Sequence, residues 1–197
     1  MIKSKSMLIG SAIAAVMASS AAMAGGHVAS QGGTLTDGLT NNAYIAATVG
    51  IADVGLNDDA VIGSVVYGKD LGGYLQNLSA EVEFTGTLAD GESDLMGTTI
   101  EASYMSAGVY AVYSYDVGTH VGIHGLDLFG KAGVAYNDYE VSSPIVTVDG
   151  SDFDLGFGVG VNYNLKALTG TDSLGVRAEW ADNGAADEVK VGLSYVF

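Results

Sequence analysis

The sequence predicts an all-β protein, namely an eight-stranded antiparallel up-and-down transmembrane β-barrel. Short segments of alternating apolar and polar residues recur from Ala43 to the end of the chain, and clusters of Asp, Asn and Gly separate them. After residue 40 no segment has the pattern of a long apolar helix, and the only proline is Pro144. An even number of antiparallel strands closes into a barrel without free edges.

Eight strands are expected, and the sixth has the clearest alternation. Its apolar face carries Phe153, Leu155, Phe157, Val159, Val161, Tyr163 and Leu165. Asp, Gly and Asn occupy the other face, as expected for a strand, whose side chains alternate with period two. In the fourth strand the phase is ambiguous near Ser106, where we expect a β-bulge. The expected strands cover residues 43–51, 60–67, 78–88, 98–115, 126–136, 153–165, 174–180 and 189–197.

The amino terminus has the features of a secretory signal peptide. Lys3 and Lys5 precede an apolar stretch over residues 7–17, and Ala22 and Ala24 fit the small-x-small cleavage pattern. We therefore expect a signal peptide over 1–24, a flexible periplasmic leader over 25–42 and a single barrel domain over 43–197. An uncleaved amphipathic anchor is the alternative for the first segment. The absence of Cys excludes a lipoprotein anchor and a disulfide framework.

The chain is strongly acidic, with a formal net charge of −16 from 7 basic and 23 acidic side chains. Removal of a signal peptide that contains Lys3 and Lys5 would make the mature protein still more negative. Such a charge excludes nucleic-acid binding through phosphates. It favours cations and basic partners.

Alternation alone does not tell a membrane barrel from a soluble barrel such as a lipocalin, in which the apolar face points inward. Charges of both signs that occur mid-strand among Gly and Ser favour a paired polar interior, and hence the membrane barrel. Aromatic residues near strand ends favour it too, because they form interfacial girdles. The expected lumen charge network is Glu81, Glu83, Glu101, Lys131, Arg177, Glu179 and Lys190. The expected girdle is Tyr67, Tyr104, Tyr136, Tyr163, Trp180, Tyr195 and Phe197.

The terminal strand alternates to its last residue, with an apolar face of Val189, Val191, Leu193, Tyr195 and Phe197. A carboxy-terminal strand that ends on an aromatic residue is what outer-membrane barrels present to the barrel-assembly machinery. We therefore predict that Val191, Leu193, Tyr195 and Phe197 act as the assembly signal.

The segments FDLGFGVGVNYNL, LGVRAEW and VGLSYVF together resemble the OmpA-like outer-membrane β-barrel family, also called small porin-like. The resemblance covers about residues 43–197 and is strongest after Phe153. It implies a monomer in the outer membrane of a Gram-negative cell, in contact with outer-membrane lipid and lipopolysaccharide, with no cofactor. The sequence ends with the barrel, so we expect no peptidoglycan-binding domain.

In this family the amino terminus faces the periplasm, which assigns each connection to a side. The implied outward loops are 52–59, 89–97, 138–154 and 182–188, and the implied periplasmic turns are 68–77, 116–125 and 164–173. The outward loops contain acidic residues and no Lys or Arg. Two oxygen-rich clusters in them suggest weak Ca²⁺ or Mg²⁺ binding, although solvated loops are the alternative. The clusters are Asp90, Glu92 and Asp94, and Asp149, Asp152 and Asp154.

The functional hypothesis is a non-enzymatic envelope-structural or surface-interaction protein that acts through its acidic outer loops. A narrow channel is the alternative, but eight strands enclose an interior that side chains fill. A lipid-modifying enzyme is disfavoured, since His120 and His124 fall in a periplasmic turn and His27 precedes the barrel. The spacing of His120 and His124 suits metal chelation on a helix, but no third His lies nearby in the sequence.

Overall fold

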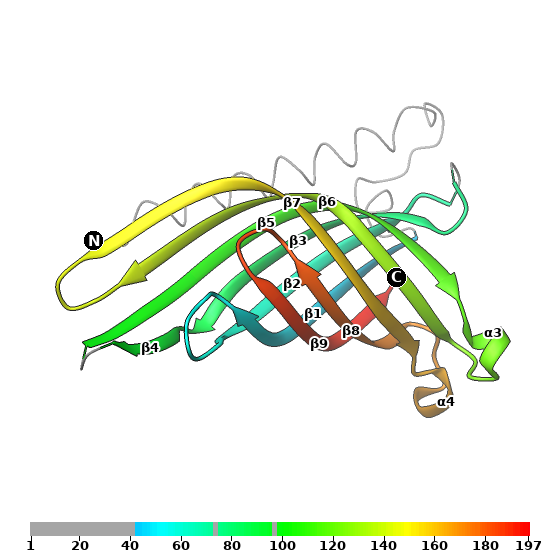
Figure 1. Cartoon of the computed structure of the whole chain (residues 1–197). Helices are drawn as coiled ribbons and strands as arrows, with labels where there is room; N and C mark the ends of the chain where they lie inside the picture. The colour runs from blue at the N-terminus through cyan, green and yellow to red at the C-terminus, as the bar shows by residue number, and fades with distance from the viewer. Residues whose placement is uncertain (1–41, 73–74, 96–97) are drawn as a thin grey trace. The chain divides into compact units, whose positions relative to one another are not determined.

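The computed structural model describes residues 42–72, 75–95 and 98–197, which contain nine strands and two one-turn helices (Figure 1). The expected signal peptide over 1–24 and all but the last residue of the expected leader lie outside the described residues. The strands are β1 (Ala43–Asp53), β2 (Ala60–Asp70), β3 (Leu78–Ala89), β4 (Gly91–Leu95), β5 (Thr98–Asp116), β6 (Leu126–Ser142), β7 (Thr147–Asn164), β8 (Leu174–Asp182) and β9 (Asp187–Val196). The helices are α3 (Gly118–Val121) and α4 (Lys166–Thr169), and none in the described part of the chain is long and apolar enough to span a membrane.

The strands form a closed antiparallel barrel, as the sequence predicts. Their order is β3-β2-β1-β9-β8-β7-β6-β5-β4, and an additional pairing between β3 and β5 closes the sheet. The short β4 continues β3 and pairs with β5, so β3 and β4 together count as one strand of an eight-stranded barrel. Closure satisfies the backbone groups of each strand between its neighbours, which is what a strand needs where no water is available.

The pairing of the wall is irregular between β3 and β4, and the β2–β3 register also shifts there, between Val61 and Ile62. Gly86 pairs with Met105 and Gly91 pairs with Ala102, so residues are inserted on the β3–β4 side. The Thr87 hydroxyl fills the gap: it accepts the Tyr104 N–H at 2.9 Å and donates to the Tyr104 carbonyl at 3.0 Å. The bulge expected near Ser106 is therefore wrong, since β5 itself pairs with β6 without a break and the inserted residues lie in the partner strand.

The apolar face points outward, which excludes the soluble, lipocalin-like alternative. Val65 is 59% exposed, whereas its strand neighbours Ser64 and Val66 are buried. A water-soluble barrel would bury these apolar side chains, because exposed apolar surface is unfavourable in water. The same outward, exposed position is held by Val49, Ile51, Val61, Val109, Leu128, Val134, Leu155, Phe157, Val159, Val189, Val191 and Leu193.

Aromatic residues border this apolar face in pairs. The rings of Tyr136 and Phe153 lie 5.0 Å apart on neighbouring strands, and those of Tyr195 and Phe197 lie 5.5 Å apart edge to face. The expected girdle is wrong for Tyr104, which points into the barrel and is buried. Its neighbours Ser106 and Tyr110 have the same parity on β5 and are buried too.

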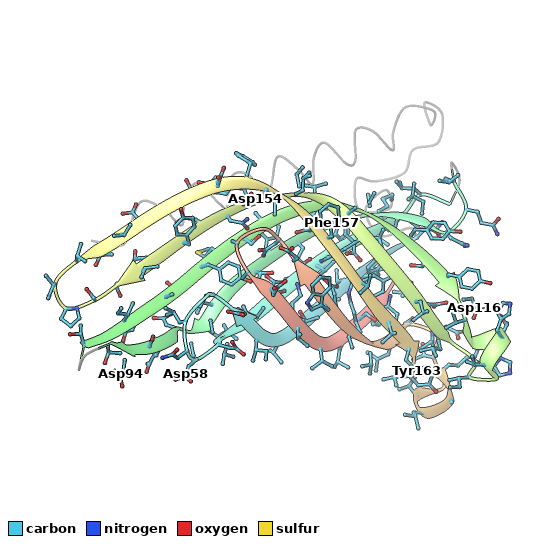
Figure 2. All side chains as sticks on the ribbon, viewed as in Figure 1. Asp58, Asp94, Asp116, Asp154, Phe157 and Tyr163 are labelled. Carbon is cyan, nitrogen blue, oxygen red and sulfur yellow. The ribbon has the colours of Figure 1, made fainter. Side chains whose placement is uncertain are left out.

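The two ends of the barrel differ. The turn end carries the connections 71–77, 117–125 and 165–173, with α3 and α4, and lies near Asp116 and Tyr163 in Figure 2. The hairpin end carries the connections 54–59, 143–146 and 183–186, and lies near Asp58 and Asp94. Two of the expected loops are wrong. Most of 138–154 continues the β6–β7 hairpin, and most of 89–97 forms β4, because backbone pairing extends beyond the apolar alternation.

The position of the membrane along β7 is testable with one charge at two heights. Val159 and Ser151 both lie on the outer face of β7, but the first is in the apolar band and the second is beyond it. We expect Val159→Arg to lower the free energy of unfolding by about 2–4 kcal/mol, whereas Ser151→Arg should cost at most about 1 kcal/mol. Urea titration of the barrel folded into lipid vesicles measures both, and equal costs would contradict this membrane position.

Candidate functional site

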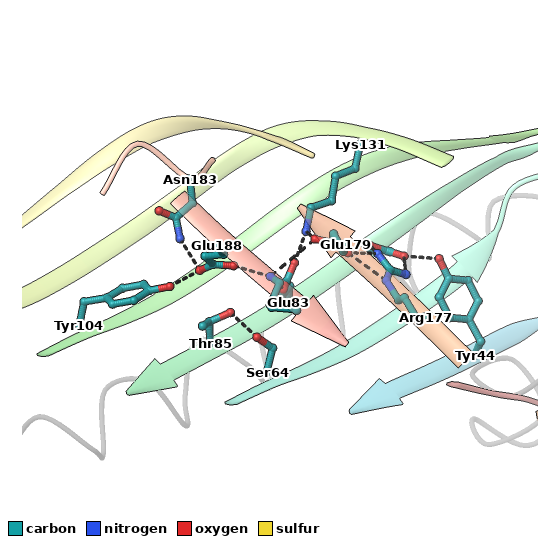
Figure 3. Close-up of polar contacts among 12 residues, drawn as sticks. Tyr44, Ser64, Glu83, Thr85, Tyr104, Lys131, Arg177, Glu179, Asn183 and Glu188 are labelled. Atoms are coloured by element: carbon teal, nitrogen blue, oxygen red, sulfur yellow. Dashed lines mark hydrogen bonds and ion pairs between the residues drawn. The ribbon is translucent and has the colours of Figure 1, made fainter. Parts of the chain in front are cut away.

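The interior of the barrel is occupied by charged side chains that meet from β3, β6, β8 and β9 (Figure 3). Strand alternation directs all of them inward, because each stands two residues from another inward position on its own strand. Each is at most 4% exposed. The group consists of four carboxylates and three cations: Glu81, Glu83, Glu179 and Glu188 with Lys131, Arg177 and Lys190. We call these residues the buried charge network.

Arg177 is the centre of the network near the turn end. Its Nη1 and Nη2 donate to the two oxygens of Glu81 at 2.5 and 3.0 Å, a bidentate geometry. Its Nε and Nη2 donate to Oε2 of Glu179 at 2.9 and 2.7 Å. Tyr44 donates its hydroxyl to Glu81 at 2.5 Å. The planar guanidinium thus joins two carboxylates from opposite sides of the wall, and it binds Glu81 with a bidentate geometry that a lysine lacks.

The two lysines continue the network toward the hairpin end. Lys131 bridges Glu83 and Glu179. Lys190 contacts Glu83 and Glu188 and lies 3.6 Å from Glu179. Charges of opposite sign therefore alternate through the lumen, and every carboxylate in the network contacts at least one cation. Such pairing is required here, because an unpaired buried charge costs several kcal/mol.

Polar side chains close the hairpin end of the network. Glu188 accepts hydrogen bonds from the Tyr104 hydroxyl and, at 2.8 Å, from Nδ2 of Asn183. The Asn183 side-chain oxygen accepts the backbone N–H groups of Ala185 and Ala186. The Asn137 side-chain amide donates to the backbone carbonyl of Asn183 at 2.8 Å. The β8–β9 connection is thereby held inward, with Asn183 3% and Ala186 6% exposed.

Aromatic rings contact the cations of the network, and glycines leave space for them. The Arg177 guanidinium lies 4.2 Å from the Phe129 ring centre, and the Lys131 ammonium lies 4.4 Å from that of Tyr110. Glycines on the inner face of β7 lie opposite them. A Cβ at Gly160 would approach the Phe129 ring to 2.4 Å, and one at Gly158 would approach the Lys131 side chain to 2.8 Å. The glycine alternation that marks this strand in the sequence thus accommodates the network.

The structure brings together all the residues of the expected lumen network except Glu101. Glu101 is exposed and lies on the outer face of β5, opposite Glu92 of β4. The inward residues of β5 have even numbers, so the odd-numbered Glu101 points outward. Sequence reasoning missed Glu188, which it placed in a loop, although Glu188 stands two residues before Lys190 and so shares its face. It also missed Tyr44, Tyr104, Asn137 and Asn183.

The carboxylates of the two expected cation clusters are not gathered into a ligand set in the described part of the chain. Among the described residues no group of three His, Asp or Glu side chains lies close enough to hold a metal ion. Asp149 lies on the outer face of β7 whereas Asp152 and Asp154 lie on the inner side, so extended backbone keeps these carboxylates apart. Asp90 stands between β3 and β4, and Glu92 and Asp94 are exposed along β4.

The two described histidines lie at the turn end. His120, in α3, stacks on Tyr115 with ring centres 5.8 Å apart, and His124 lies in the connection that follows. Both side chains are exposed. His27 is outside the described residues.

Comparison with known families identifies the architecture. Residues 11–197 match the family model described as the outer membrane protein beta-barrel domain. The chain belongs to this family. The match supports the resemblance seen in the sequence, and membership implies location in the outer membrane. A search of curated proteins finds no match.

Solved structures show the same fold at low identity. Neisserial surface protein A (NspA) aligns with a TM-score of 0.59 and 15% identity, over 80% of this chain and 98% of that chain. The amino-terminal barrel of Pseudomonas aeruginosa OprF aligns with a TM-score of 0.52 and 12% identity, over 78% and 96%. A major outer membrane protein of Thermus thermophilus aligns with a TM-score of 0.50 and 14% identity, over 79% and 98%.

Removal of the guanidinium should expose the cost of unpaired charge. Arg177→Met leaves Glu81 and Glu179 without their shared cation, so we expect a loss of about 3–5 kcal/mol in the free energy of unfolding. The double variant Arg177→Met with Glu81→Gln removes one charge of each sign and should recover a large part of that loss. Urea titration in lipid vesicles measures both values.

The matched control is Lys166→Met at the turn end. Lys166 and Asp172 form an ion pair at 2.8 Å whose side chains are 64% and 68% exposed. Because water screens such a pair, its loss should cost less than about 1 kcal/mol. Equal losses for Arg177→Met and Lys166→Met would show that the buried network contributes nothing special to stability.

Proposed function

We propose that this protein is a non-enzymatic outer-membrane barrel with a sealed lumen, and that it acts through an acidic surface displayed outside the cell at the hairpin end. The observation that carries the proposal is the buried charge network, in which each charge inside the barrel is paired with another protein group. Paired charges hold the wall together and leave none free to guide a permeating ion or a substrate.

Packing on both sides of the network supports a sealed lumen. Toward the hairpin end, Tyr104 and Ala186 pack with Ala52 and Ile62 inside the barrel. Toward the turn end, a cavity of ≈ 160 Å³ is lined by Tyr44 and by residues of β3, β5, β6, β7, β8 and β9. Tyr44, which donates to Glu81, lies between this cavity and the network. In an eight-stranded barrel such filling is the expected state of the interior.

The outward placement of the hairpin end follows the family orientation, in which the amino terminus faces the periplasm, since β1 starts at the turn end. The two ends also differ in charge. The hairpin end has no Lys or Arg in its strand ends and connections, whereas Lys69 and Lys166 lie at the turn end. A surface of this sign attracts basic partners and repels anionic ones. Its acidic residues are Asp53, Asp58, Asp59, Asp90, Glu92, Asp94, Glu101, Asp138, Glu140, Asp149, Asp152, Asp154, Asp182 and Asp187.

The orientation is testable because the chain has no Cys of its own. We expect Ser151→Cys, at the hairpin end, to react with a membrane-impermeant maleimide on intact cells. Thr119→Cys, at the turn end, should react only after the cells are broken. Labelling is read on gels after purification of the outer membrane. The reverse pattern would overturn the orientation, and recovery of the protein in the soluble fraction would overturn the location.

The sealed lumen is testable by conductance. We expect wild-type protein in planar lipid bilayers to show no steady single-channel steps, because the network fills the barrel. Glu179→Ala should likewise leave the baseline flat, since Lys131, Arg177 and Glu83 remain in place. Steady wild-type steps that Glu179→Ala or Arg177→Ala abolishes would instead establish a narrow channel.

A further inference from the structure

The wall of the barrel is uneven in height at the hairpin end. β8 ends at Asp182, which pairs with Phe157, so residues 147–156 of β7 pair with β6 alone among the described strands. β6 and β5 extend with β7, and β4 lies on the far side of β5. Figure 1 shows the β6–β7 hairpin reaching beyond β8 and β9. We call this four-stranded extension, residues 91–95, 98–104, 137–142 and 147–152, the projecting sheet.

The outer face of the projecting sheet has the reverse polarity of the barrel below it. On the outer face of β6, apolar Val134 and Tyr136 are followed by Asp138 and Glu140. On the outer face of β7, Leu155 and Phe153 are followed, toward the tip, by Ser151 and Asp149, and β5 and β4 add Glu101, Glu92 and Asp94. The backbone pairing continues without a break through this change. The backbone is therefore the same on both sides of the change, and only the side chains differ. They make the outer face of the projecting sheet acidic.

Toward the hairpin tip, the inner face of the projecting sheet carries an exposed apolar cluster, whereas Tyr104 and Asn137 at its base are buried. Tyr139, Val141 and Val148 lie on this part and are 43%, 38% and 57% exposed. Among the described strands, β8 and β9 beside β7 and β1 and β2 across the barrel all end below this height. Val141 and Val148 are directly paired neighbours, and the Tyr139 ring lies over Gly150 on the adjacent strand. Adjacent apolar residues exposed to water in this way are a feature of binding surfaces.

The open edge of β7 is the third feature. An unpaired edge strand offers its N–H and C=O groups to another strand. The N–H of Phe153 is bound by the Asp152 side chain at 2.7 Å, which indicates that it points away from β6. Because alternate residues of a strand point their N–H groups the same way, that of Ser151 also faces the open edge. Asp149, Asp152 and Asp154 place negative charge along this edge, so a second copy of the chain would be repelled.

We propose that the projecting sheet binds a polypeptide segment that adds to the edge of β7 as a further strand. Apolar side chains of the segment cover Tyr139, Val141 and Val148, and its alternate, basic side chains meet the acidic outer face. Main-chain hydrogen bonds supply affinity, and the alternation selects the partner. This partner deepens the proposed function and depends on the hairpin end facing outward. The chemistry required is an extended cationic segment with alternate apolar residues.

The test uses the mature protein folded in detergent micelles and a capped peptide of alternating Lys and Val. We expect fluorescence anisotropy to show salt-sensitive binding of this peptide. A peptide of the same composition with a central Pro, and one of alternating Glu and Val, should not bind. The first cannot complete the strand pairing, and the second has the wrong charge.

Two variants of the protein locate the binding. Ser151→Pro removes one edge-facing N–H, and Val148→Asn removes an apolar contact on the inner face. We expect each to weaken Lys-Val peptide binding about tenfold, a loss the size of one or two net contacts. Ile145→Asn is the matched control: Ile145 is 90% exposed at the hairpin tip, outside the projecting sheet, so binding should be unchanged. The gel-mobility shift between boiled and unboiled samples shows that each variant is folded.

Three results would overturn the proposal: no binding of the Lys-Val peptide, equal binding of the Pro-interrupted peptide, or dimerisation of the wild type through the β7 edge. If Ser151→Pro fails to fold, the comparison of peptide binding by Val148→Asn and by Ile145→Asn still tests the proposal. Labelling of Ser151→Cys on cells separates this proposal from the proposed function. Surface labelling without peptide binding would retain the outward hairpin end and remove the strand partner.

Discussion

Charge neutralisation inside a narrow barrel is the constraint on which this structure depends. The outer face must be apolar to meet lipid, so the polar residues that alternate with it are directed into a space too small for bulk water. Four carboxylates and three cations share that space. They coexist because Arg177 spans Glu81 and Glu179, and Lys131 and Lys190 both reach Glu83.

The rest of the interior is shaped around these pairs. Phe129 and Tyr110 provide aromatic faces for the cations, and Gly158 and Gly160 leave the room that a side chain would take. At the hairpin end Asn183 turns the β8–β9 connection inward over Glu188. The network therefore links strands that are far apart in the sequence and seals the lumen, so functional surface is left at the ends of the barrel.

The uneven wall determines what kind of surface the hairpin end presents. With β8 ending at Asp182 and β1 at Asp53 while β7 continues to Thr147, one side of the barrel becomes an open sheet that rises above the strands beside it and across from it. Apolar residues such as Val148 then occupy the inner face and acidic ones such as Glu140 the outer. The sheet keeps its backbone geometry, while its surroundings change from lipid and packed lumen to water on both sides.

The sequence alone determined the barrel, the strand order and the faces of most strands, because period-two alternation is a local property that Phe157, Val159 and Arg177 each obey. It failed where a residue's environment depends on distant strands. Glu101 is a charged mid-strand residue like those of the lumen, but its odd number places it on the outer face of β5. Glu188 lies in a segment that resembles a loop in the sequence, but its side chain points inward beside Tyr104. Only the tertiary structure decided which carboxylate meets which cation, and where the wall ends, since strand length and register arise from pairing between segments rather than within them.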